Sequence, residues 1–217
     1  MHKALVIKEL RESAGLIAVA VAAAAYALAD LTGVRLLPIQ NGMPSAYPFV
    51  GDTTLTMYLC LLAGSLAILL GFKQSAWELW QNTYLFLLHR PASRTAIFAT
   101  KLVVGIAVLL LVPGALIQLY AMWAATPGNH ATPFFWSMTA WAWKLWFAFP
   151  LVYLGAFLSG IRPRRWFGSR LLPLATAGVL AAVAAAMPWW WLALAIVLVA
   201  AAAYVAIIFH TVQTRNF

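Results

Sequence analysis

Apolar runs long enough to cross a bilayer recur along this chain, and they restrict its possible folds more than any other feature. A membrane-spanning helix needs about 20 apolar residues to cover roughly 30 Å of hydrocarbon. Of the 217 residues, 65% are hydrophobic and only 9% are charged, which is more apolar surface than a water-soluble fold can bury. The runs lack the polar–apolar alternation of a membrane β-barrel. We therefore predict an all-α polytopic membrane protein, with residues 1–217 forming a single transmembrane domain.

Six transmembrane helices fit the apolar runs. Residues 1–12 precede the first of them, and helical spacing places Val6, Ile7 and Leu10 on one face, opposite most of the charged side chains. That pattern is typical of a short interfacial helix that lies on the membrane before the chain turns in. Only Met187-Pro188 separates the last two spans. The expected spans are about 13–31, 53–72, 102–124, 134–160, 171–187 and 189–209.

Basic residues gather on one side of these spans. Arg35 lies on the opposite side, and the charge pattern leaves the side of Lys144 open. Because cytoplasmic loops carry an excess of Lys and Arg, both termini are expected to be cytoplasmic, in a multi-pass protein of the inner (cytoplasmic) membrane. The net charge of +9 is then explained by topology and by anionic membrane lipid, not by nucleic acid. The basic residues on the cytoplasmic side are Lys3, Lys8, Arg11, Lys73, Arg90, Arg94, Lys101, Arg162, Arg164, Arg165, Arg170 and Arg215.

The segment 73–101, between the second and third spans, holds the longest mixture of charged, polar and turn-forming residues. Its part ELWQNTYLFLLHR is compatible with a helix, which Pro91 would end. Ser93 is expected to be the N-cap of a further helix that leads into the third span. Residues 85–88 are all apolar, which a solvated turn does not need but a helix in a partner's groove does. A solvated hairpin whose charges only set topology is the alternative.

The spacing within this segment resembles the cytoplasmic loop of ABC-2-type transporter permeases. The shared pattern is E-x(4)-T-x(3)-LL-x-R-P-x-S-R-x(6)-K, and the opening IKELRES (7–13) is similar to the elbow helix that precedes the first span in that family. The plan of six spans with both ends inside also agrees and covers the whole chain. The pattern is carried here by Glu78, Thr83, Leu87, Leu88, Arg90, Pro91, Ser93, Arg94 and Lys101.

The resemblance implies a permease subunit of an ATP-driven transporter, with an exporter the more expected kind. Such a subunit pairs with a second permease copy or a paralogue and binds two separate P-loop ATPase subunits, which carry the ATP and Mg²⁺. The main coupling helix would lie around residues 83–89, with Glu78, Arg90, Pro91 and Arg94 orienting it or meeting the ATPase. Residues 161–170, with Arg164 and Arg165, would form a second contact. No Gly-Lys pair occurs in this chain, so it lacks a phosphate-binding P-loop of its own.

This chain differs from one subset of the family in the connection between its last two spans. Relatives that handle polysaccharides or sterols carry a re-entrant helical hairpin between the last two spans, for which Met187-Pro188-Trp189 leaves no room. The substrate, the direction of transport and the choice between homodimer and heterodimer therefore stay open.

Three residues are candidates for a substrate pathway. Gln118 and Tyr120 lie near the far end of the third span, where they either line a pore or meet the membrane interface. If the fourth helix begins near Phe134, Lys144 lies about 15 Å deep, where an intramembrane charge indicates a functional site. Alternatively, residues 132–142 form an interfacial helix and Lys144 reaches the outer surface. Both interpretations remain open.

Enzymatic functions fit the positions of the polar residues poorly. Haem ligation would need histidine at mid-membrane depth, but all four His lie at span ends or in loops. A hydrolase would need a nucleophile with a base, or paired acids on a metal, and all five acidic residues also lie at or beyond span ends. Cys60 is the single cysteine and gives no disulfide or metal framework. We expect no catalytic, cofactor-binding or metal site on this chain.

A non-transporting membrane anchor or assembly factor that docks a cytoplasmic partner is the alternative to the transport function.

Overall fold

A computed structural model describes residues 2–34, 47–77, 93–162 and 169–214. These residues are mostly helical and contain no strand, so the predicted all-α class is confirmed. The helices are α1 (His2–Leu31), α2 (Thr53–Phe72), α5 (Arg94–Ala125), α6 (Ala140–Ile161), α7 (Leu172–Ala186) and α8 (Trp190–Thr214). A π-helical turn, η1 (Lys73–Trp77), follows α2, and a 3₁₀ turn, η2 (Trp136–Thr139), precedes α6.

Five of the described helices are long and apolar enough to cross a membrane, which makes the chain a membrane protein. They comprise α1, α2 with η1, α5, α6 with η2, and α8. The fifth predicted span corresponds to α7, which has only 15 residues. At 1.5 Å per residue α7 is about 22 Å long, short of the roughly 30 Å of bilayer hydrocarbon. Length and composition therefore identify five spans where the sequence predicted six.

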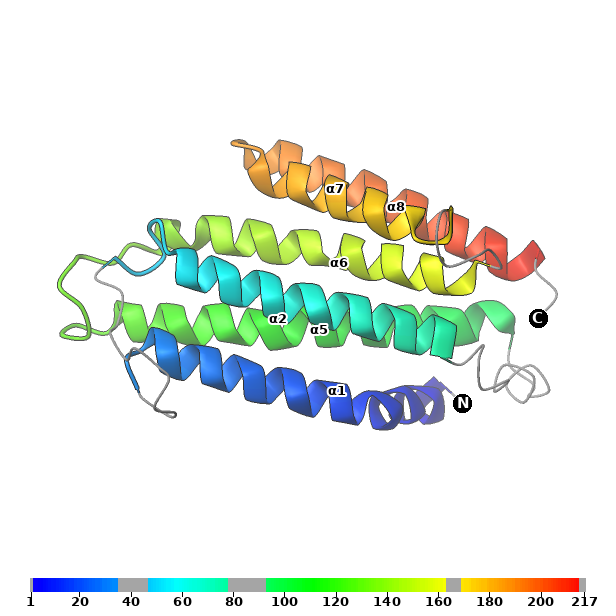
Figure 1. Ribbon diagram of the computed structural model, residues 1–217, viewed down its shortest axis with the longest axis horizontal. Helices are drawn as coiled ribbons and strands as arrows, with labels where there is room; N and C mark the ends of the chain where they lie inside the picture. The colour runs from blue at the N-terminus through cyan, green and yellow to red at the C-terminus, as the bar shows by residue number, and fades with distance from the viewer. Residues whose placement is uncertain (1, 35–46, 78–92, 163–168, 215–217) are drawn as a thin grey trace.

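The long helices lie side by side along one axis (Figure 1). We call the end where α1 begins the N-terminal end of the bundle; α2 and α6 finish there, α5 and α7 begin there, and α8 ends there. The central helix is α6, because 67% of its apolar stretch is buried, compared with 17% in α1 and 22% in α8. The pair α7 and α8 packs against α6 on the side away from α1 (Figure 1).

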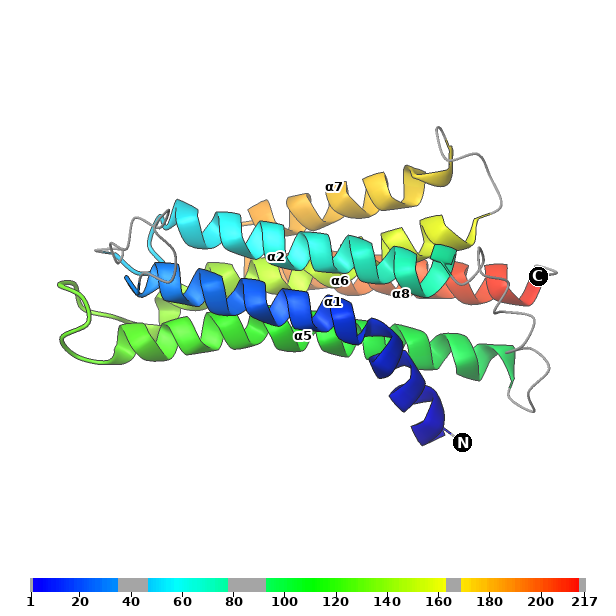
Figure 2. The same ribbon diagram turned by 60° about the horizontal axis from the view of Figure 1, so that its bottom comes forward.

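The interfacial helix and first span predicted for residues 1–12 and 13–31 form one continuous helix, α1. Figure 2 shows that the first turns of α1 diverge from the direction of the remainder. The segment that carries the charged residues is thus bent away from the apolar part without a break in the helix.

Local sequence explains where several helices begin and end. The Asp52 side chain caps α2 by accepting a hydrogen bond from the Leu55 backbone N–H at 2.9 Å. Ser93 caps α5 as predicted, with its hydroxyl accepting from the Ala96 N–H at 3.3 Å. α5 therefore starts before the predicted third span and continues into it. Pro188 follows the C-cap of α7, where a residue without a backbone N–H cannot continue the helix.

The start of the fourth span differs from the predicted residue 134. A 3₁₀ turn begins at Trp136 and the α-helix begins at Ala140. Phe135 keeps an extended backbone as the N-cap of this turn, and its side chain makes no capping hydrogen bond. The chain therefore enters this span through a tight turn.

Glycine permits two close helix contacts in the bundle. A Cβ on Gly71 of α2 would lie 2.9 Å from the Tyr153 carbonyl oxygen of α6. A Cβ on Gly155 of α6 would lie 2.8 Å from the Pro173 carbonyl oxygen of α7. Real side chains do not tolerate such distances, so these two glycines let α6 approach both neighbours, as small residues do between membrane helices.

Pro113 lies inside α5 and Pro150 inside α6, and both helices continue through their proline. Proline has no N–H and crowds the preceding turn, which weakens the helical hydrogen bonds there. The Trp146 indole N–H of α6 donates to the Leu110 carbonyl, one turn before Pro113, at 2.8 Å. This carbonyl is next to that of Leu109, whose helical N–H partner Pro113 lacks, so the indole bond ties α6 to the turn that the proline disturbs.

Candidate functional site

A buried ion pair joins α1 to α5 near the N-terminal end of the bundle. The Lys101 ammonium lies 2.8 Å from the Glu9 carboxylate, and the two side chains are 0% and 4% exposed. Lys8 also approaches Glu9, at 3.6 Å, from a partly exposed position. A buried charge is strongly unfavourable unless it is paired, so each of Glu9 and Lys101 fixes the position of the other.

Two further polar residues lie beside this pair. The Tyr153 hydroxyl of α6 donates to the Gln74 side-chain oxygen at 2.6 Å and lies 3.3 Å from the Lys101 carbonyl oxygen. All four side chains are buried. We call Glu9, Gln74, Lys101 and Tyr153 the buried polar cluster. It joins α1, η1, α5 and α6 through charged and hydrogen-bonded contacts.

The backbone positions these side chains in specific ways. The π-helical turn η1 widens the end of α2 and places both Gln74 and Ser75 in the interior. Ser75 donates back to the Gly71 carbonyl at 2.5 Å, so its hydroxyl is satisfied within its own segment. On α5, Gly105 leaves the space that the Tyr153 hydroxyl and the Gln74 amide occupy, since a Cβ there would overlap with both.

The predicted coupling segment enters and leaves the bundle beside the buried polar cluster. Gln74 lies three residues before Trp77, after which the described chain stops until Ser93, and Lys101 lies two turns into α5. Arg94 is the exposed first residue of α5. The other predicted coupling residues lie outside the described residues: Glu78, Thr83, Leu87, Leu88, Arg90, Pro91, Arg164 and Arg165.

Arg170, at the end of the predicted second contact 161–170, binds the last turn of α6. Its guanidinium donates to the carbonyl oxygens of Ser159 at 3.1 Å and Gly160 at 3.0 Å. The Ser159 hydroxyl in turn accepts from the Leu174 N–H at 3.2 Å. Cationic capping of this kind satisfies carbonyls that the end of a helix leaves open. Hydrogen bonds therefore hold the end of α6 and the start of α7 together.

The opposite end of the bundle is closed by aromatic residues. The buried Phe49 ring packs against Tyr120 at 4.9 Å between centroids and against Phe134 at 6.1 Å. The Trp141 indole donates to the Phe49 carbonyl at 2.5 Å. The Tyr120 hydroxyl donates to the Asp52 carboxylate at 3.2 Å. We call this group the aromatic closure.

The three candidates for a substrate pathway lie in different surroundings. Tyr120 is buried in the aromatic closure, whereas Gln118 is exposed on the surface of α5. Lys144 is the fifth residue of α6, about 6 Å along the helix from Ala140. Its ammonium donates to the Met187 carbonyl, at the C-cap of α7, at 2.5 Å. The structure therefore does not bring the three together, and Lys144 has a structural partner.

Glu9, Gln74 and Tyr153 are not among the site residues predicted from the sequence, and Lys101 is predicted only as a cytoplasmic charge and as the last residue of the pattern. The one feature of the sequence that could have pointed to this cluster is the position of Lys101 at the start of a long apolar run. Among the described residues, no group of three or more His, Cys, Asp and Glu residues is placed to hold a metal ion. The cluster offers one ion pair and hydrogen bonds that connect four helical segments.

Comparisons of the chain with protein-family models, with curated proteins and with solved structures found no match.

Proposed function

We propose that this chain is the transmembrane permease subunit of an ATP-driven ABC transporter, of the ABC-2 type, and that it couples to separate ATPase subunits through the segment 73–101. The observation that carries the proposal is the attachment of both flanks of that segment to the rest of the bundle. Gln74 on one flank binds Tyr153 of α6, and Lys101 on the other binds Glu9 of α1.

Coupling requires that a displacement of the docking segment moves the transmembrane helices. The flanks of that segment must therefore be held firmly to the bundle. A buried ion pair and a buried hydrogen bond at the flanks meet this requirement, because breaking either leaves a polar group in the interior. Displacement of the docking segment would then pass through α2 and α5 to α6 and α1, to which these two contacts tie them. The ATPase partner would supply the P-loop, the ATP and the Mg²⁺, and this chain would perform no catalysis itself.

The proposed topology places the N-terminal end of the bundle in the cytoplasm and counts α7 as a short span, the fifth of six along the chain. Support comes from the charges, since the described basic residues apart from Lys144 lie in the segments at that end. Under this topology the chain is a multi-pass protein of the cytoplasmic membrane. A second permease copy or paralogue would complete the pathway, and the likeness favours export.

The test is co-purification of an ATPase from native membranes, detected by photolabelling the purified complex with azido-ATP. The wild-type protein is expected to carry a labelled subunit. Leu87→Ala, Leu88→Ala and Arg90→Ala are each expected to lose it while the protein still inserts into the membrane. Leu111→Ala, at a 71% exposed position of α5, is the matched control and should retain the label. An unlabelled wild-type preparation, or labelling that persists in all three variants, would refute the coupling assignment.

A further inference from the structure

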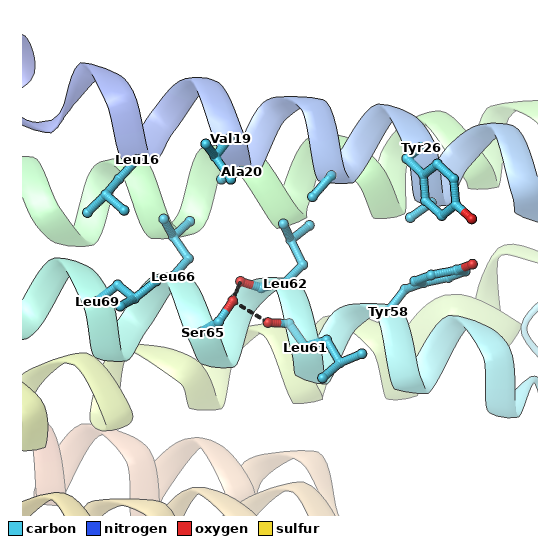
Figure 3. Close-up of a pocket in the computed structure, with 12 residues that line it drawn as sticks. Leu16, Val19, Ala20, Tyr26, Tyr58, Leu61, Leu62, Ser65, Leu66 and Leu69 are labelled. Atoms are coloured by element: carbon cyan, nitrogen blue, oxygen red, sulfur yellow. Dashed lines mark hydrogen bonds between the residues drawn. The ribbon is translucent and has the colours of Figure 1, made fainter. Parts of the chain in front are cut away.

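An apolar groove runs between α1 and α2 on the outside of the bundle. Figure 3 shows Leu16 and Leu69 at one end of it and Tyr26 and Tyr58 at the other. The groove has a volume of about 280 Å³, many times the roughly 30 Å³ of a water molecule in the liquid. It is lined by Leu16, Val19, Ala20, Ala23, Tyr26, Ala27, Tyr58, Leu61, Leu62, Ser65, Leu66 and Leu69.

The groove exists because the two helices present different side chains to each other. Half of the lining residues of α1 are alanines, while most of those of α2 are leucines, which do not fill the space that the alanines leave. Ser65 is the one hydroxyl in its middle, and it bonds back to the carbonyls of Leu61 and Leu62 (Figure 3). The middle of the groove therefore offers no free hydrogen-bonding group and suits a hydrocarbon occupant.

The length of the groove matches one leaflet of a bilayer. It extends from Leu16 to Ala27 on α1 and from Leu69 to Tyr58 on α2, which at 1.5 Å per residue is about 16 Å on each helix. Half of the bilayer hydrocarbon is about 15 Å thick. Val19 and Leu61 line the groove and are 68% and 62% exposed, so it opens towards the surrounding lipid. One extended acyl chain lying parallel to the helices has the required dimensions.

A charged group marks the end of the groove that faces the membrane surface. The rings of Tyr26 and Tyr58 meet edge to face at 6.4 Å, and the Tyr58 hydroxyl donates to the Asp30 carboxylate at 2.8 Å. Tyrosine is typical of the interface where lipid head groups begin. A carboxylate at this depth complements a cationic head group and repels an anionic one.

We propose that this groove is a binding site for an aminophospholipid of the leaflet at the Asp30 end of α1. One acyl chain lies along the alanines of α1, and the ammonium head group lies at Asp30. The site goes beyond the proposed transport function, because it requires neither an ATPase nor transport.

The test uses the full-length protein reconstituted in vesicles with phosphatidylethanolamine that carries a diazirine in the middle of one acyl chain. After photolysis, mass spectrometry should locate adducts on groove residues of α1 and α2. Ala23→Phe fills the groove and should lower this yield several-fold. Ala22→Phe is the matched control, since Ala22 is exposed on the same helix but does not line the groove, and it should leave the yield unchanged.

The head group is tested separately with a phosphatidylglycerol probe of the same acyl structure. Wild-type protein should give more groove adducts with the amine head group, and Asp30→Asn should remove that preference. Tyr58→Phe, which keeps the carboxylate, should retain it. Adducts spread evenly over all lipid-facing helices, or equal losses in Ala23→Phe and Ala22→Phe, would overturn the proposal. So would a disulfide-linked dimer of a Val19→Cys, Cys60→Ser variant in vesicles, because a second copy would then occupy the groove.

Discussion

Glu9 and Lys101, which are 92 positions apart in the chain, form an ion pair of 2.8 Å in the interior of the bundle. Glu9 belongs to the bent first turns of α1, and Lys101 lies two turns after the start of α5. The pair therefore holds the bent segment against the helix that continues from the proposed coupling segment. Such a contact sets the relative position of two elements even where its net contribution to stability is small.

Removing one member of this pair should cost far more than removing both. Glu9→Gln takes the ion-pair carboxylate away from the fully buried Lys101 ammonium, and we expect it to lower stability by about 3–5 kcal/mol. Lys101→Met leaves Glu9 with the more distant Lys8, at 3.6 Å, and should cost less than Glu9→Gln. The double variant Glu9→Leu, Lys101→Met should recover most of that loss. The measurement is the thermal unfolding midpoint of the purified protein in detergent. Single variants as stable as the wild type would contradict the buried pairing.

The pair of Lys8 and Glu12 is the natural control for this experiment. Their charged groups are 3.3 Å apart, but the side chains are 29% and 46% exposed. Solvent screens an ion pair of this kind, so Glu12→Gln should change stability by less than about 1 kcal/mol. A loss as large as that of Glu9→Gln would mean that the bent segment of α1 is sensitive to any change of charge.

The crossing of α6 and α7 at Gly155 should not accept a side chain. A Cβ there would lie 2.5 Å from the Ala177 Cβ, so Gly155→Ala must push the two helices apart, at a cost of about 1–3 kcal/mol. Gly178→Ala, in α7 itself, is the control, because a Cβ there meets nothing within 4 Å. Thermal unfolding of the two variants should separate them clearly. Equal midpoints would show that α7 can shift without loss.

Lys144 should prove to be a structural residue. Lys144→Met leaves the Met187 carbonyl without its donor and removes a cation from the C-terminal end of α7, which should cost about 1 kcal/mol. Lys144→Arg keeps the charge and a donor and should be close to the wild type in stability. If Lys144 instead binds a substrate, Lys144→Met will abolish ATP-driven transport with an unchanged unfolding midpoint. The two measurements together decide between these roles.

Local features of the chain could be predicted from its sequence, whereas distant pairings could not. The helical class follows from apolar runs without alternation, and the cap at Ser93 and the break at Met187-Pro188 follow from side chains that act on their own backbone. The spacing of charges around Glu9 predicted a polar helix face. It did not reveal that the face meets Lys101, because that contact depends on how α1 packs on α5.

Helix length and irregular backbone were the weaker predictions. The fifth predicted span, about 171–187, was already short, and because Leu171 and Met187 are the caps of α7, the 15-residue helix between them is too short to count as a span by length. The π-helical turn at Lys73–Trp77 carries no sequence signal, although it orients Gln74. Part of the candidate site was therefore invisible because it depends on a backbone irregularity that packing stabilises.

At Phe49 we expect glycine to be a better replacement than alanine, the reverse of the usual order. Its ring is fully buried in the aromatic closure, yet its backbone has φ 67°, a left-handed conformation that a bulky residue adopts only under constraint. Both Phe49→Ala and Phe49→Gly lose the ring and should destabilise the protein by about 3–5 kcal/mol. Glycine accepts this conformation without strain, so Phe49→Gly should be more stable than Phe49→Ala by about 1 kcal/mol.

At the exposed neighbour Val50, where φ is not positive, alanine should be the better of the two replacements. Unfolding midpoints of the four variants test this, and an alanine advantage at both positions would show that the left-handed turn does not persist without the phenylalanine ring.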